Sequence, residues 1–439
     1  MSESLSGYRG KVKQILEKAN VRVGQLIRLA RDSEVYEGTL MPRTELGDSD
    51  HIVIKLRNGY NAGIRAGPEL AIEFLEEGVR PSFTTPQPPP SSEKLPQVTI
   101  VSTGGTIASR VEYRTGAVRP ALSAEDLHSV VPELSNIARV RAEILLSLLS
   151  ENITPKHWTE ISKAVARRIE AGDAGVVVAH GTDTMAYTAA ALSFALEDLP
   201  CPVVMVGSQR SSDRPSSDAP LNLTAAVHAA ANSQFAGVIV AMHENTSDDA
   251  VALHRGTKVR KCHTSSRDAF ESINVPLVGR VAGGMIDVLD SSFGKRVKNK
   301  KVKLNPNFDE RVLLLQTYPG LSPKILDWAI ENQYRGIVLA GTGLGHANQD
   351  LFNGIGKAVQ HGLLLTMTSQ CLWGSTSMNV YDTGRDLLHL GVLPAGDMLP
   401  EVALVKMMWL LAQDLSKDEI KTLMQKNIAG ELYERRLIT

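Results

Sequence analysis

The feature that most constrains this chain is a series of short, almost continuous apolar segments in its second part. They read VTIVS, GVVVAH, PVVMVGS, GVIVAM, RVLLLQT, GIVLAGT and LLLTMTS. Segments of this kind, separated by longer stretches with helical spacing, are typical of parallel strands that are buried on both faces and connected by helices. Sites in such sheets form at the carboxyl ends of the strands. Because these ends carry Gly, Ser, Thr and His, the sequence predicts an α/β fold with a polar site at one sheet edge.

A proline-rich segment separates this part from a small N-terminal unit. Five prolines lie between Pro86 and Pro96, which favours an extended spacer and excludes a helix, so we predict a linker over residues 80–97. Residues 1–79 contain a helix-spaced segment followed by four or five short strand patterns with turn signals between them. That pattern predicts a small all-β barrel of the SH3-like or OB-like type. Such a barrel could bind RNA or protein, or serve as a structural adaptor.

After the linker we expect two α/β lobes, at residues 98–290 and 309–439, joined by a basic connector at 291–308. The connector has six Lys or Arg residues between Lys295 and Lys303. A run of charges is most simply a solvated surface, and contact with RNA is the alternative interpretation.

Composition excludes several classes of protein. A length of 439 residues is too great for one compact core, and a net charge of −1 argues neither for nor against binding to nucleic acid. The three cysteines form no C-x-x-C pair, which argues against a disulfide framework and a zinc cluster. We find no apolar h-region and no run long enough to span a membrane, so we expect a cytoplasmic protein.

The first candidate site is the Gly-Gly turn of "VSTGGTIAS", which ends at Thr106. Glycines let the backbone approach a ligand. The motif matches neither the G-x-G-x-x-G pattern nor the P-loop, which weighs against a nucleotide site. A reactive or ligand-binding loop and a plain turn both stay open at this point.

The second candidate is "HGTDT", in which Thr182, Asp183 and Thr184 follow a strand. These residues could simply cap a helix, although one cap needs only one of them. Lys261 in "GTKVRKCHTSS" is a third candidate. A lysine beside an aspartate could act as a base, and a solvated loop is the alternative. Spacings of eleven and nine residues between His243, His254 and His263 match no metal-binding pattern.

Taken together, "TGGTIAS" at 103–109 and "HGTDTM" at 180–185 resemble the two signature segments of the L-asparaginase/glutaminase family. The similarity continues in order through "VGSQRSSDRPSSDAPLNL" and "AGDMLPEVALVKMMWLL", over roughly residues 97–430. The resemblance implies a two-lobed asparaginase-like fold with mainly parallel sheets, preceded here by the small β-barrel.

Carried over by position, the resemblance implies that Thr106 is the nucleophile that attacks a side-chain amide and forms an acyl-enzyme. Thr182, Asp183 and Lys261 match a second catalytic set that supports proton transfer through a threonine hydroxyl. Tyr113 matches a lid residue that closes over the substrate. The chemistry needs no metal and no organic cofactor in this chain.

The resemblance also implies substrate-binding positions at Ser150, Glu151 and Gly181. Free-standing members of the family often have Gln where Glu151 stands. The "GTGLGH" segment departs from the family pattern, so His346 receives no role.

The added N-terminal unit and linker resemble those of the asparaginase-like subunits in archaeal GatDE-type glutamyl-tRNA(Gln) amidotransferases. That resemblance implies that this chain releases ammonia from glutamine or asparagine. A GatE-like partner subunit would bind Glu-tRNA(Gln), activate its glutamyl group with ATP and Mg²⁺, and receive the ammonia. It further implies a homodimer within a heterotetramer, away from membranes.

Two alternatives make different predictions. A stand-alone cytoplasmic L-asparaginase/glutaminase would not need residues 1–97. A non-enzymatic RNA or protein adaptor would keep its activity after Thr106→Ala.

Overall fold

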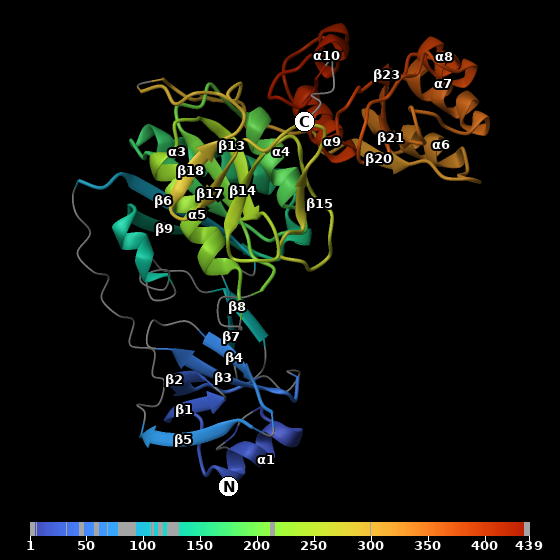
Figure 1. The fold of residues 1–439 in the computed structure, drawn as a ribbon. Helices are drawn as coiled ribbons and strands as arrows, with labels where there is room; N and C mark the ends of the chain where they lie inside the picture. The colour runs from blue at the N-terminus through green and yellow to red at the C-terminus, as the bar shows by residue number, and fades with distance from the viewer. Residues whose placement is uncertain are drawn as a thin grey trace.

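The computed structural model describes residues 5, 7–31, 33–43, 48–56, 61–67, 69–77, 94–105, 107, 109–112, 117–120, 131–210, 216–298 and 300–433. Figure 1 shows an N-terminal unit in blue, a lobe in cyan to yellow and a lobe in orange to red. Most of the predicted linker lies outside the described residues. The predicted domain boundaries stay predictions.

The N-terminal unit combines one helix with an antiparallel sheet. Its elements are α1 (Gly10–Lys18), β1 (Leu26–Arg31), β2 (Glu34–Leu40), β3 (His51–Leu56), β4 (Asn61–Arg65) and β5 (Ala71–Glu76). The strands pair in the order β4-β3-β2-β1-β5, and every pair is antiparallel. Val12 and Leu16 of α1 pack against a core that includes Ile27 and Leu29 of β1. The prediction of a small N-terminal β unit is confirmed.

The sheet of the first lobe joins parallel and antiparallel strands. Its strands are β6 (Gln97–Gly104), β9 (Arg139–Leu148), β10 (Gly175–Ala179), β12 (Pro202–Val206), β13 (Gly237–His243), β14 (Ala250–Arg255), β17 (Gly279–Ala282) and β18 (Met285–Val288). Their order is β18-β17-β14-β13-β12-β10-β6-β9. From β13 to β9 the neighbours are parallel, as predicted, whereas β14, β17 and β18 extend the sheet antiparallel.

Helices cover both faces of this sheet (Figure 1). Because side chains alternate along a strand, Val176 and Val178 of β10 contact the core under α3 (Pro155–Glu170) and α4 (Met185–Ala195). Val177, between them, faces the core under α5 (Ala219–Asn232). Each strand of the middle of the sheet is therefore buried on both sides, which explains its nearly continuous apolar sequence.

Smaller elements complete the lobe. They are the hairpin of β7 (Ser109–Glu112) and β8 (Ala117–Pro120), the hairpin of β15 (Val259–Lys261) and β16 (Phe270–Ser272), the pair β11 (Leu196–Glu197) and β19 (Lys303–Leu304), and the 3₁₀ turns η2 (Pro132–Asn136) and η3 (Ser150–Asn152).

The second lobe has a parallel sheet of its own, in the order β20-β21-β22-β23. Its elements are β20 (Val312–Gln316), α6 (Lys324–Glu331), β21 (Gly336–Gly341), η4 (Gln349–Leu351), α7 (Phe352–Gln360), β22 (Leu364–Ser369), α8 (Asp382–His389), β23 (Leu393–Pro394), α9 (Pro400–Leu411) and α10 (Lys417–Met424). All seven apolar segments singled out in the sequence are strands of the two sheets.

Helix α9 joins the two lobes. Every one of its residues except Leu404 is buried. Its core cluster contains Phe194 of α4 as well as Val338 of β21, and the Phe194 and Trp409 rings stack with centroids 5.8 Å apart. Because α9 is buried on almost every side and is apolar except for Glu401 and Lys406, it acts as shared core rather than as a surface helix.

Candidate active site

The carboxyl ends of β6 and β10 meet through two glycines. Gly105 follows β6 with φ of +83°, which is in the left-handed region that glycine adopts without strain. A Cβ at Gly105 would lie 2.5 Å from the Gly181 nitrogen, so the two backbones are in contact. The Gly-Gly turn therefore places the end of β6 directly against the "HGTDT" segment. Thr106, which follows in the chain, and Tyr113 lie outside the described residues.

Lys261 connects the second candidate motif to the third. Its Nζ donates to Thr182 Oγ1 at 2.8 Å and to Asp183 Oδ1 at 2.7 Å. The Lys261 side chain is 13% exposed, whereas that of Asp183 is 68% exposed. Thr182, Asp183 and Lys261 form what we call the polar cluster. It lies at the carboxyl edge of the sheet, as the sequence predicted for its site.

The capping interpretation of "HGTDT" does not describe what these side chains do. Thr184 is the N-cap residue of α4, but its side chain makes no capping hydrogen bond. Its hydroxyl donates instead to the Ser150 carbonyl oxygen at 2.7 Å. Thr182 and Asp183 contact Lys261, so all three polar side chains of the motif bind groups outside the helix.

The solvated-loop interpretation of residues 258–261 is likewise wrong. Lys258 is fully buried, and Lys261 ends β15, whose partner is β16. Lys258, directly before β15, and Lys261, at its end, are buried and nearly buried. Burying an ammonium group is costly unless it is paired, so this segment is not a solvated loop.

Of the predicted substrate-binding residues, Ser150 and Gly181 lie beside the polar cluster. A Cβ at Gly181 would meet the Ser150 Oγ at 2.8 Å. Ser150 is buried and begins η3, and the next residue, Glu151, is exposed. The structure therefore brings this turn to the edge that carries Thr182.

A buried chain of hydrogen bonds, which sequence reasoning missed, ends beside Thr182. The Trp158 Nε1 donates to Thr188 Oγ1 at 3.1 Å, and Thr188 lies 2.9 Å from His180 Nε2. His180 Nδ1 lies 2.7 Å from the Gly181 carbonyl oxygen. Since a carbonyl only accepts, Nδ1 carries the proton, and Nε2 accepts from the Thr188 hydroxyl.

The His180 ring is neutral at physiological pH. Burial lowers the pKa of His180 to about 4, against a hydrogen bond to Gly181 that acts to raise it. A neutral ring with one fixed tautomer sets the orientation of the Gly181 peptide, which directly precedes Thr182. The only sequence signal for it is a histidine between an apolar strand and a glycine.

Hydrogen bonds at this edge also hold the described parts of the "GSQRSSDRPSSDAPLNL" segment, residues 207–210 and 216–223. Asn222 donates to the Gly207 carbonyl oxygen at 3.0 Å, and a Cβ at Gly207 would lie 2.8 Å from Thr182 Cγ2. Asp218 accepts from the backbone of Gln209 and Arg210. These contacts hold residues 207–210, which directly follow β12, beside the polar cluster.

Other candidate groups lie elsewhere. His346 Nδ1 is 3.2 Å from the Thr383 hydroxyl in the second lobe. Within the part of the chain that the structure describes, no three His, Cys, Asp or Glu residues gather as a metal site would require. Over that same part, none of the helices has both the length and the apolar character of a membrane span.

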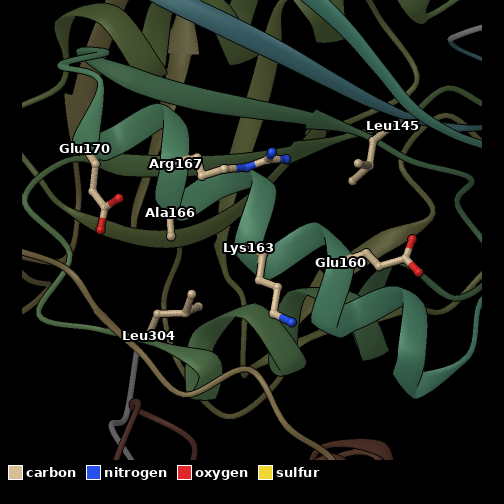
Figure 2. A pocket seen from close by; sticks show the side chains of 7 residues that line it. All are labelled: Leu145, Glu160, Lys163, Ala166, Arg167, Glu170 and Leu304. Carbon is tan, nitrogen blue, oxygen red and sulfur yellow. The ribbon is translucent and has the colours of Figure 1, made fainter.

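The basic connector lines a hollow at the opposite edge of the first lobe. This hollow of about 880 Å³ includes Ala174 and Cys201, which directly precede β10 and the Pro202 start of β12. An adjoining hollow of about 420 Å³ lies along α3 and shares Glu170 with it. Figure 2 shows that its lining side chains come from successive turns of α3 and from two neighbouring segments; they are Leu145, Glu160, Lys163, Ala166, Arg167, Glu170 and Leu304.

Several cations of the connector are bound by groups of the chain itself. Asp198 accepts from Lys300 at 3.1 Å and from Lys303 at 2.8 Å, and Arg296 donates to the backbone oxygens of Ser233 and Ala230. These contacts favour the solvated-surface interpretation over contact with RNA.

Comparison with known proteins places the chain among asparaginase-related sequences. Residues 97–293 match the family described as Asparaginase, N-terminal, and residues 311–424 match the Glutaminase/Asparaginase C-terminal domain. Residues 21–75 match the GatD N-terminal domain.

Two similar proteins each match nearly the whole chain. It is 49% identical to the D subunit of glutamyl-tRNA(Gln) amidotransferase from Metallosphaera sedula, over 98% of this chain and 97% of that protein. It is 47% identical to the protein of the same name from Pyrococcus abyssi, over 96% and 97%. Among solved structures, the thermostable L-asparaginase from Thermococcus kodakarensis is similar with a TM-score of 0.68 and 35% identity, over 77% of this chain and 100% of that one. L-asparaginase I from Vibrio cholerae has a TM-score of 0.67 and 32% identity, over 77% and 99%.

Proposed function

Because this chain belongs to the family of the glutamyl-tRNA(Gln) amidotransferase D subunits, we propose that it hydrolyses the side-chain amide of glutamine or asparagine. The ammonia is used by a GatE-like partner subunit to convert Glu-tRNA(Gln) to Gln-tRNA(Gln). The observation that carries the proposal is the polar cluster, with Lys261 Nζ within 2.8 Å of Thr182 and Asp183, against the turn that leads to Thr106.

Thr106 acts as the nucleophile. A neutral hydroxyl is a poor nucleophile and needs a base or a proton relay. As the Thr106 oxygen bonds to the amide carbon, its proton passes to the Thr182–Lys261 pair. The same pair returns a proton to the nitrogen as the C–N bond breaks, so ammonia leaves as a neutral molecule. Water then cleaves the acyl ester and regenerates the hydroxyl.

The substrate lies between Ser150, Glu151 and Gly181. The exposed Glu151 carboxylate suits the α-ammonium group of a free amino acid, and the buried Ser150 hydroxyl beside Gly181 suits its α-carboxylate. Tyr113 closes over the bound amino acid. This chemistry uses no cofactor in this subunit, and the ATP and Mg²⁺ bind to the partner.

The assembly is a homodimer of this chain within a heterotetramer in the cytoplasm. Support comes from large apolar side chains left exposed on loops of the second lobe. They are Tyr318, Leu344, Trp373, Val380 and Tyr381, and we call them the apolar patch. Exposed apolar patches of this kind mark protein–protein contacts.

The test is Thr106→Val in the full chain with its partner. The change keeps the side-chain volume and removes the hydroxyl, so glutamine hydrolysis and glutamine-dependent transfer should fall below detection. Transfer should return when ammonium is added. A variant that keeps its glutaminase activity, or that ammonium does not rescue, contradicts the proposal. Thr182→Val is the matched variant. If this variant still shows a slow burst of acylation, Thr182 relays the proton and Thr106 is the nucleophile.

A stand-alone L-asparaginase is the second candidate, because the solved structures named above are L-asparaginases. The match of residues 21–75 to the GatD N-terminal domain weighs against it. Removal of residues 1–93 distinguishes the two. A stand-alone enzyme should keep its kinetics, whereas a subunit should lose its partner-dependent transfer.

A further inference from the structure

Strand β15 has two faces with different partners. Side chains alternate along a strand, so Val259 and Lys261 share one face. Val259 is fully buried in the core of the first lobe, and Lys261 binds Thr182 and Asp183. Arg260 points the other way, as does Lys258 directly before the strand, and both contact acidic residues of the second lobe.

Lys258 is fixed to the loop before α9. Its Nζ donates to Asp397 Oδ2 at 2.7 Å and to the Asp397 carbonyl oxygen at 3.0 Å. The other carboxylate oxygen of Asp397 accepts from the Tyr433 backbone at 2.9 Å. Lys258 is 0% exposed and the Asp397 side chain is 8% exposed. Removing one partner of such a pair leaves an uncompensated buried charge, which is strongly destabilising locally.

Arg260 is held by the first turn of α9. Its Nη1 lies 3.5 Å from Glu401 Oε2, and the Glu401 side chain is 6% exposed. Glu401 is the second residue of α9, where the helix N-terminus favours a negative charge. Two acids of the second lobe, one in the loop before α9 and one in its first turn, thus contact Arg260 of β15 and Lys258 directly before it.

We propose that Asp397 and Glu401 are positioning residues for the amidohydrolase reaction. By holding one face of β15, they keep Lys261, on the opposite face, at hydrogen-bonding distance from Thr182 and Asp183. The inference rests on the proposed function of the polar cluster. It assigns to the second lobe a part in catalysis without contact with the substrate. A displacement of about 1 Å at a reacting group can lower a rate about 100-fold, so small shifts of β15 are enough.

The experiment compares Asp397→Asn and Glu401→Gln in the full chain with its partner. Both changes keep the size of the side chain and remove the charge. We expect kcat for glutamine hydrolysis to fall about 10- to 100-fold while KM changes less than about threefold, since an interaction lost only in the transition state lowers kcat. Glu401→Asp, which keeps the charge, should recover part of the rate.

The matched control is Asp309→Asn. Asp309 is an acid of the second lobe with a side chain 10% exposed, paired with Arg311 and Arg335. It should lose some thermal stability, because two ion pairs are lost, and keep kcat within about twofold. Equal effects of all three substitutions on kcat would overturn the proposal, because they would reflect general destabilisation.

A second readout separates positioning through Lys261 from any other effect. With γ-glutamyl hydroxamate, a substrate with a better leaving group, the slow Lys261→Met variant stays measurable. Adding Glu401→Gln to Lys261→Met should lower its rate less than about twofold, because coupled residues are not additive. A full additive loss would overturn the inference. If the unmodified complex has no amidohydrolase activity at all, the proposed function itself fails, and the two failures are therefore distinguishable.

Discussion

The two lobes use the same edge of the same kind of sheet in different ways. At the carboxyl edge of the first sheet, the loop after β10 presents hydroxyl and charged groups, and Lys261 contacts two of them, Thr182 and Asp183, at 13% exposure. At the carboxyl edge of the second sheet, the loops after β20, β21 and β22 present Tyr318, Leu344 and Trp373 to solvent. Parallel topology fixes where a site can form, and the loop residues decide whether that site catalyses a reaction or binds a protein partner.

The difference also appears in how the loops are fixed. The first edge is held by Gly105 against Gly181 and by the buried His180 ring. In the second, Gln370 donates to the Ala340 carbonyl oxygen at 2.8 Å and the His346 and Tyr381 rings are 5.3 Å apart, with the Tyr381 side chain left exposed. A rigid polar edge suits a reaction, and an exposed apolar edge suits a partner surface.

The largest expected effect comes from removing the charge at the first edge. Lys261→Met should lower kcat for glutamine hydrolysis about 10³-fold, because positioned acid–base groups contribute about 10²- to 10⁴-fold. Steady-state kinetics on the complex, with circular dichroism as a check of folding, measures it. Lys298→Met, in the exposed connector, is the control and should leave kcat unchanged. A Lys261→Met variant with an unchanged kcat would contradict the assignment of the first edge to catalysis.

The next effect is on stability against acid. The His180 pKa is about 4 in the folded chain and about 6.5 when unfolded, so below pH 6.5 the unfolded state binds more protons. Stability is fully present above pH 6.5 and falls as the pH approaches 4, by about 3 kcal/mol from this ring. Urea unfolding between pH 7 and 4.5 should show a smaller slope in His180→Gln than in the unmodified chain.

His389→Gln is the control for that experiment, because His389 is exposed. Its slope with pH should equal that of the unmodified protein. An unchanged slope in His180→Gln would mean that the folded ring takes up a proton over the same pH range as the unfolded ring, and the edge would be less rigid than its hydrogen bonds indicate.

The smallest effect on stability is expected at the second edge. Trp373→Ser removes half-exposed apolar surface and should change the free energy of unfolding by less than about 0.5 kcal/mol. Self-association, measured by analytical ultracentrifugation, should weaken markedly. Trp328→Ser, a 42% exposed tryptophan on α6, should leave self-association unchanged. Equal behaviour of the two variants would contradict the assignment of the apolar patch.

Much of the fold followed from local pattern. All seven apolar segments are strands because a strand buried on both faces has no polar positions to interrupt it. β9 carried no such signal, since it is the edge strand and Arg139, Arg141 and Glu143 alternate with its apolar residues. The antiparallel extension by β14, β17 and β18 was missed too, because a strand's own sequence does not specify the direction of its neighbour.

The sequence located the candidate site but did not predict the contacts that hold its residues together. The residue types and the strand ends pointed to Thr182, Asp183 and Lys261, while their catalytic roles came from family resemblance and stay proposals. The bond between Lys258 and Asp397 spans 139 residues, and no local pattern encodes such a pairing. His180, Thr188 and Trp158 were missed for the same reason, because each looks like an ordinary core residue until the helices pack.

Helix α9 has a consequence for how the molecule can move. Swinging the lobes apart would hydrate side chains such as Val402, Met407 and Trp409, which are buried on every side. At about 1.5 to 3 kcal/mol for each large apolar side chain, even a partial opening is out of reach of thermal motion at useful rates. The amino acid and the ammonia must therefore enter and leave through local rearrangement of loops, while the two lobes move as one rigid body.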